Sequence, residues 1–225
     1  MYPTATGDKK EQFQAIYLNM QPRIRAHCTH VGIVTGCFLA NRYRRQLCKT
    51  YGVPEAALAE VIMKAGEYHD IGKSMMSDAL CKKTRLNQTE RKMLRQHPQL
   101  GVQLLDEFGD ALFDSGGAKQ VALDMALCHH EHFDGSGYPN GLKADEIPLL
   151  AQLCALANEL DNAVHTGHRN AFGSVADLVM EKSGVWFSKA AVSAFTENMD
   201  EITALYTQKH SWIKAGAADA AEHND

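Results

Sequence analysis

The stretch His129-His130-Glu131-His132-Phe133-Asp134-Gly135-Ser136-Gly137-Tyr138-Pro139 runs two adjacent histidines straight into an acidic, glycine-rich turn. Three glycines and a proline within residues 134–141 exclude a helix, so this part must be a loop. A second compact unit, residues 69–73, reads His-Asp-Ile-Gly-Lys. Neutral imidazole and carboxylate are ligands that first-row transition metals prefer, so the two units together predict a metal site.

Around these units the apolar residues follow a helical spacing almost throughout. The expected helices cover residues 24–50, 54–70, 87 to beyond 98, 118–131, 149–165, 174–182 and 188–208. The first helix carries His27 on its inward face. Asn87 with Glu90 resembles a capping box, and Pro98 should kink or interrupt its helix just after His97. Strand patterns are weak everywhere, which predicts an all-α fold of about seven or eight helices in one domain.

Composition narrows the class of protein further. The chain has 225 residues, is 45 % apolar and carries a formal net charge of −4, so it is not expected to bind DNA. No apolar run approaches the roughly 20 residues that span a bilayer, and the N-terminus lacks a secretory pattern. The six cysteines are scattered without a C-x-x-C pair, as is usual for reduced cytosolic thiols. A cytoplasmic protein without a membrane association is therefore predicted.

In order and spacing, these motifs resemble the HD-GYP domains, a branch of the HD metal-dependent phosphohydrolases found in bacteria. The resemblance also includes His97-Pro98-Gln99-Leu100-Gly101 and the segment 141–148, and it covers roughly residues 24–172. It implies the following organisation of the chain: an N-terminal extension or helix over 1–23, an HD-GYP core over 24–172, C-terminal helices of the same domain over 173–215, and a tail over 216–225.

The resemblance implies a phosphodiesterase that opens a cyclic dinucleotide, with cyclic di-GMP as the first candidate, by attack of a metal-bridging hydroxide on phosphorus. It implies two divalent transition metals, with iron or manganese preferred and zinc or nickel able to bind. The implied metal ligands are His27, His69, Asp70, His97, His129, His130 and Asn158. His27 and His69 would hold one metal, and the three later histidines the other, with Asp70 as the bridge and a catalytic residue.

Substrate contacts are also implied by the resemblance. Lys73 would lie near the bridging hydroxide and contact the scissile phosphate as a second catalytic residue. The implied substrate-binding residues are Lys73, Asp134, Gly135, Tyr138 and Arg169. The loop that carries Tyr138 borders the expected pocket, and it is also a candidate surface for a protein partner.

The chain departs from the family pattern at three places. Asn158 stands where the family has a ligating Asp, and its neutral amide oxygen binds a transition metal more weakly. Asp161 lies three residues on, on roughly the same helix face, and is the alternative ligand. Arg23 replaces a Glu that supports a third metal in some members, so two metals or one are expected.

The third departure concerns phosphate binding. The family usually has an Arg-Pro-Tyr-Arg/Lys element here, but residues 167–172 read Gly-His-Arg-Asn-Ala-Phe, which leaves Arg169 as a partial replacement. Gln152 also replaces a common Arg. Two other hypotheses therefore stand beside the phosphodiesterase: a degenerate HD-GYP module that binds or interacts without turnover, and an HD-type hydrolase for another cyclic dinucleotide or nucleotide.

Overall fold

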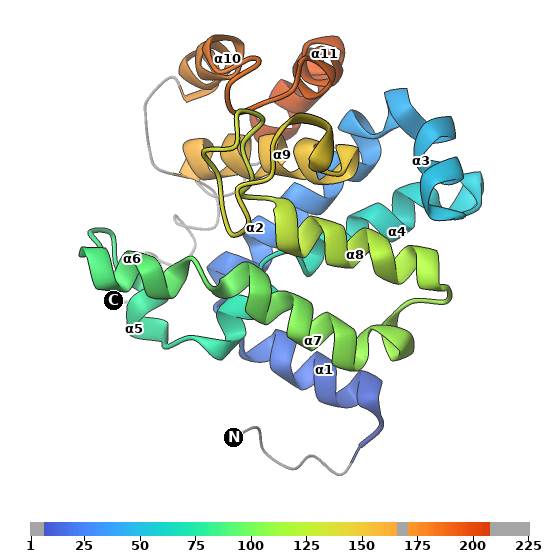
Figure 1. Ribbon diagram of the computed structural model, residues 1–225, viewed down its shortest axis with the longest axis vertical. Helices are drawn as coiled ribbons and strands as arrows, with labels where there is room; N and C mark the ends of the chain where they lie inside the picture. Colours follow the sequence, from blue (N-terminus) through green and yellow to red (C-terminus); the bar gives the residue numbers. More distant parts are fainter. Residues whose placement is uncertain (1–6, 166–170, 208–225) are drawn as a thin grey trace, which may run out of the picture.

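The computed structural model describes residues 7–165 and 171–207, and Figure 1 shows that these residues form a bundle of helices. The α-helices are α1 (Lys9–Asn19), α2 (Pro22–Ile33), α3 (Arg44–Tyr51), α4 (Glu55–Glu67), α5 (Asp78–Lys82), α6 (Gln88–Leu94), α7 (His97–Leu112), α8 (Gly116–Cys128), α9 (Leu149–His165), α10 (Ala171–Glu181) and α11 (Lys189–Glu197). Residues 199–207 are helical as well. The described residues contain no strand, so the all-α prediction is confirmed.

Short irregular helices connect several of the longer ones, so the described residues are divided into more helices than the expected seven or eight. They are a π-helical turn, η1 (Val34–Leu39), and the 3-10 turns η2 (Asn41–Tyr43), η3 (Ile71–Met75) and η4 (Ala144–Glu146). The single helix predicted over 24–50 is in fact α2, η1, η2 and α3 in succession. At η1, Gly36 packs so tightly on α4 that an added β-carbon would lie 2.9 Å from the Ala59 carbonyl oxygen. This contact between helices leaves no trace in hydrophobic periodicity.

The predicted interruption after His97 lies in fact before it. The capping box at Asn87 and Glu90 is present and starts α6, which ends at Leu94. α7 then begins at His97, with Pro98 in its first turn. Proline is tolerated there because the first helical N–H groups have no intrahelical partner. Pro98 therefore lies in the first turn of a new helix, and His97 is the first residue of that helix.

Close contacts between glycines bring the motif-bearing elements together. Where α2 crosses α4, a β-carbon on Gly66 would come within 2.3 Å of the Gly32 α-carbon, so this crossing requires glycine. A β-carbon on Gly72 would lie 2.0 Å from the His97 carbonyl oxygen. Gly72 thus allows η3 to pack on the start of α7, and the His69-Asp70 unit lies against His97 as a result.

The remaining helices enclose this centre in one hydrophobic core. Figure 1 shows α9 lying across the bundle, with α10 and α11 on its outer side and α1 beside α7. Phe13 of α1 is fully buried and packs its ring edge-on against Tyr68. Leu150, Leu153 and Leu156 of α9 are fully buried as well. Among the described residues, no helix is both long enough and apolar enough to cross a membrane.

Candidate metal centre

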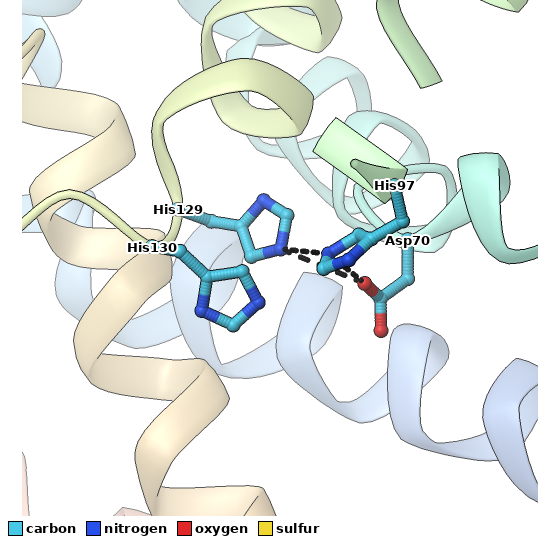
Figure 2. Close-up of side chains that lie close together, drawn as sticks. All are labelled: Asp70, His97, His129 and His130. Atoms are coloured by element: carbon cyan, nitrogen blue, oxygen red, sulfur yellow. Dashed lines mark hydrogen bonds and ion pairs between the residues drawn. The ribbon is translucent and has the colours of Figure 1, made fainter. Parts of the chain in front are cut away.

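Four helices deliver histidines to one buried carboxylate. His27 comes from the middle of α2, and His69 and Asp70 follow the end of α4. His97 opens α7, and His129 caps the end of α8, with His130 next to it. Figure 2 shows the side chains of Asp70, His97, His129 and His130 directed toward one another. Helix ends allow neighbouring side chains to converge in a way that adjacent positions within a helix do not.

The two carboxylate oxygens of Asp70 face different histidines. Oδ2 lies 3.8 Å from Nε2 of His27 and 3.6 Å from Nε2 of His69. Oδ1 lies 3.0 Å from Nε2 of His97 and 3.5 Å from Nε2 of His129. Two sets of side chains that could hold a metal ion result: the first group, His27, His69 and Asp70, and the second group, Asp70, His97, His129 and His130. Asp70 belongs to both.

The far nitrogen of each ring fixes which nitrogen faces Asp70. Nδ1 of His69 donates to the Gly66 carbonyl oxygen at 2.7 Å, and Nδ1 of His97 donates to that of Leu94 at 2.7 Å. Nδ1 of His129 donates to backbone carbonyls of the preceding turn at 3.0 Å. Carbonyl oxygens only accept, so Nδ1 carries the proton and Nε2 keeps its lone pair, as a metal-binding histidine requires.

Burial keeps these rings neutral, whereas the groups around Asp70 keep its carboxylate charged. Burial lowers the pKa of His97 to about 4, and it lowers the pKa values of His69 and His130 well below the usual range. Burial alone would raise the pKa of Asp70, but Lys73 and the surrounding histidines outweigh it and hold that pKa well below the ordinary value. Neutral imidazole beside carboxylate is the protonation state that binds divalent cations.

Among the described residues, ring nitrogens of the centre lack the partner that a metal ion would provide. Nε2 of His69 is buried without a hydrogen-bond partner in the described part of the chain. Nε2 of His97 and Nε2 of His129 lie 3.2 Å apart with both lone pairs toward each other, which is unfavourable unless a cation lies between them. Ligand atoms at about 2.1 Å from a first-row cation lie about 3.0–3.4 Å apart, close to these separations. The donor set and its spacing therefore fit a metal.

Asn158 and Asp161 of α9 meet opposite nitrogens of the His27 ring. Asp161 Oδ2 accepts from Nδ1 at 2.7 Å, and Asp161 Oδ1 lies 3.4 Å from Nδ1 of His30. The amide oxygen of Asn158 lies 3.0 Å from Nε2, the nitrogen that also faces Asp70. Both side chains are buried. Asn158 therefore lies on the metal side of His27, and Asp161 lies behind the ring.

Lys73 lies at the edge of the first group. Its Nζ donates to Asp70 Oδ2 at 2.5 Å, and the side chain is half-buried. Burial opposes the charge of this amine, but the adjacent Asp70 carboxylate outweighs it and raises the pKa of Lys73. A cation therefore persists at neutral pH beside the bridging carboxylate.

The glycine-rich loop folds back over the second group. Tyr138 stacks on His130, with ring centroids 4.6 Å apart and planes at 19°. A β-carbon on Gly137 would lie 2.3 Å from the His132 backbone nitrogen, so glycine is needed for this close return. Glu131, which is buried, accepts from the backbone N–H groups of Asn140 at 2.7 Å and of Leu142 at 3.0 Å. These two hydrogen bonds to the buried Glu131 side chain hold the loop in place.

Two other predicted substrate-binding residues, Asp134 and Gly135, lie in the turn of this loop. The exposed Asp134 carboxylate accepts from the Ser136 backbone N–H at 2.9 Å and closes the turn, in which Gly135 adopts a φ of 85°. Arg169 lies outside the described residues. Two contributors were missing from the sequence interpretation: Glu131 as the fastening of the loop, and Arg95, whose guanidinium lies over the Tyr138 ring. Glu131 stands within the decisive motif itself, whereas nothing in the sequence pairs Arg95 with Tyr138.

Histidines from several helices of the bundle face both oxygens of one buried Asp. This arrangement defines a class of metal-site domain built on a His-Asp pair. The family model described as "HD domain" matches residues 19–183, and this chain belongs to that family. The HD-GYP resemblance of its motifs is confirmed by the relatives and the solved structure described next.

The curated relatives include two cyclic dinucleotide phosphodiesterases. The 3'3'-cGAMP-specific phosphodiesterase 2 of Vibrio cholerae is 30 % identical over 167 residues, which is 72 % of this chain and 31 % of the relative. A cyclic di-GMP phosphodiesterase of Thermotoga maritima is 32 % identical over 200 residues, which is 85 % of this chain and 50 % of the relative. The chain thus spans between about a third and a half of these relatives.

A solved structure supports the fold. Bd1817, an HDG"Y"P protein from Bdellovibrio bacteriovorus, superimposes with a TM-score of 0.57 at 18 % identity. The match covers 85 % of this chain and 57 % of that one. At this identity the likeness concerns the arrangement of helices.

Proposed function

We propose that this chain is a metal-dependent phosphodiesterase that hydrolyses a cyclic dinucleotide, with cyclic di-GMP as the first substrate to test. The observation that carries the proposal is the division of the Asp70 oxygens between two sets of histidines. The relatives named as cyclic dinucleotide phosphodiesterases support the substrate class.

The ligand assignment follows from the nitrogens that face Asp70. His27, His69 and Asp70 would hold one cation, and Asp70, His97, His129 and His130 the other. We infer that Asn158 supplies the last oxygen of the first group, because it meets Nε2 of His27. Asp161 is then a positioning residue, since it holds the same ring through Nδ1.

Each protein group has a defined part in the reaction. When bound, a pair of divalent cations activates water at neutral pH and offsets the charge of the phosphoryl oxygens. Asp70 is held ionised by Lys73 and the histidines and fixes the spacing of the two groups. Lys73 stays protonated and its side chain is 21 % exposed, so its ammonium can reach the anionic phosphate. His69, His97 and His129 present Nε2 without rearrangement because their Nδ1 atoms are already bonded to backbone carbonyls.

A turnover screen tests the proposal directly. Protein loaded with iron or manganese is incubated with cyclic di-GMP, 3'3'-cGAMP and cyclic di-AMP, and linear products are quantified by chromatography. His129→Ala should abolish hydrolysis. His132→Ala, three residues away and outside both ligand groups, is the matched control and should retain most of it. If the wild-type protein hydrolyses none of the three dinucleotides, the proposal is refuted.

A binding module without turnover is the second candidate, and the neutral Asn158 on the metal side of His27 is the observation that favours it. Binding of cyclic di-GMP to metal-loaded and chelated protein separates the two candidates. The enzyme reading predicts that chelation weakens binding at least tenfold, about 1.4 kcal/mol, because metals and Lys73 hold the phosphates. Equal affinity in the two forms would favour the module.

A further inference from the structure

Arg95 lies at the rim of the metal centre, where its guanidinium pairs with no carboxylate of the described residues. It caps the end of α6, two residues before His97, and its side chain is exposed. Within the described residues, the side chain of Arg95 makes no ion pair and no hydrogen bond. Its guanidinium carbon lies 4.8 Å from the centroid of the Tyr138 ring, a cation–π geometry.

The ring beneath Arg95 is itself fixed on the second group. Tyr138 stacks on His130, and its backbone N–H donates to the His130 carbonyl oxygen at 3.0 Å. The His130 ring lies 5.0 Å from that of His97 and 4.2 Å from that of His129. A continuous stack, from guanidinium to phenol to imidazole, therefore runs from the rim into the centre. Burial raises the pKa of Tyr138, so the phenol stays neutral and the positive charge of the rim comes from Arg95.

A cyclic dinucleotide carries two phosphates, and the metal centre with Lys73 accounts for one. The paired basic element expected after α9 is absent from this sequence, which reads Gly167-His168-Arg169-Asn170. A guanidinium that stacks on an aromatic face keeps its N–H edge free, and that edge matches two phosphate oxygens. Arg95 is held in this way over Tyr138, which itself stacks on His130 of the second group.

We propose that Arg95, held by Tyr138, binds the second, non-scissile phosphate of the substrate and so selects two-phosphate substrates over simple phosphodiesters. This inference rests on the proposed function and names a specificity-determining contact for the same site. Tyr138 acts as the platform that orients the guanidinium, and its hydroxyl is not required for that role.

The test compares two substrates in steady-state kinetics on metal-loaded protein. One is cyclic di-GMP, and the other is bis(p-nitrophenyl) phosphate, which has a single phosphodiester. For Arg95→Ala we expect KM for cyclic di-GMP to rise at least tenfold, with a loss in kcat/KM at least tenfold larger than for the small substrate. Arg91→Ala, an exposed arginine one helical turn earlier on α6, is the matched control and should behave as wild type for both substrates.

Two variants of Tyr138 add a readout that a structural role would not give. Tyr138→Phe keeps the ring and should keep the low KM for cyclic di-GMP, whereas Tyr138→Leu removes the platform and should raise KM as Arg95→Ala does. Equal losses on both substrates in Arg95→Ala, or no loss on either, would overturn the inference. If wild-type protein cleaves bis(p-nitrophenyl) phosphate but neither binds nor cleaves any cyclic dinucleotide, the proposed function itself fails, and the Arg95 subsite with it.

Discussion

The two ligand groups that share Asp70 are anchored in different ways. In the second group, His97 and His129 donate through Nδ1 to carbonyls of their own helical turns. In the first group, His27 depends on the Asp161 side chain of α9, 134 residues away. Backbone anchors form together with the helix, whereas a side-chain anchor exists only once α2 and α9 have docked. We therefore expect the second group to be the stronger and more autonomous metal site.

Removal of Asp70 should have the largest effect, because both groups use it. Asp70→Ala should lower turnover at least about a thousandfold, about 4 kcal/mol in activation free energy, and should reduce the content of both metals. Metal analysis and steady-state kinetics measure this. Asp106→Ala, an exposed Asp on α7, is the control. Loss of one metal alone would contradict a bridging role and separate the two groups.

Lowering the pH should have the next largest effect. It should destabilise the metal-free protein, because the buried histidine rings of the folded state are neutral. Burial lowers the pKa of His97 to about 4, so the unfolded chain binds this proton near pH 6.5 and the folded chain does not. Stability is therefore present above pH 6.5 and falls as pH drops toward 4, by about 3 kcal/mol for this ring.

Chemical denaturation with chelator at several pH values checks this loss. His97→Gln cannot titrate, so in this variant the loss of unfolding free energy between pH 6.5 and 4 should be smaller by about that amount. A slope unchanged by this substitution would mean that the backbone-anchored ring is protonated in the folded state, contrary to the neutral second group described above.

Asp161→Ala should weaken the first group selectively. Loss of an outer-shell partner typically costs about 10–100-fold in metal affinity, and only His27 of the two groups bonds to Asp161 among the described contacts. Competitive titration with a chelating indicator should show one weakened and one unchanged metal. Asp161→Asn, whose amide oxygen still accepts from Nδ1, should lose less. Equal weakening of both metals would erase the distinction between the two anchors.

Asn158→Asp should narrow the difference between the groups. A carboxylate in place of the amide beside a dication should tighten the first metal about tenfold, about 1.4 kcal/mol. If Asn158→Asp changes nothing while Asp161→Ala abolishes the first metal, then Asp161 is the ligand.

Local sequence signals were sufficient for several elements of the fold. The capping box at Asn87 and Glu90 starts α6 as predicted, and α9 covers Leu149–His165 as predicted. Each depends on interactions within one helix or on one apolar face. The break in the predicted 24–50 helix depends instead on contact between Gly36 and α4, and periodicity does not record a contact with a distant helix.

By itself, the sequence determined an all-helical domain of the HD-GYP type and the histidines that accompany Asp70, because motif order and helix periodicity are local properties of the chain. Only the tertiary structure decided which nitrogen of His27 meets Asn158 and which meets Asp161. Both residues lie on the same face of α9, so their spacing is equally compatible with either role. It likewise decided that Arg95 lies over Tyr138, since they meet only when α6 and the loop fold against the same metal centre.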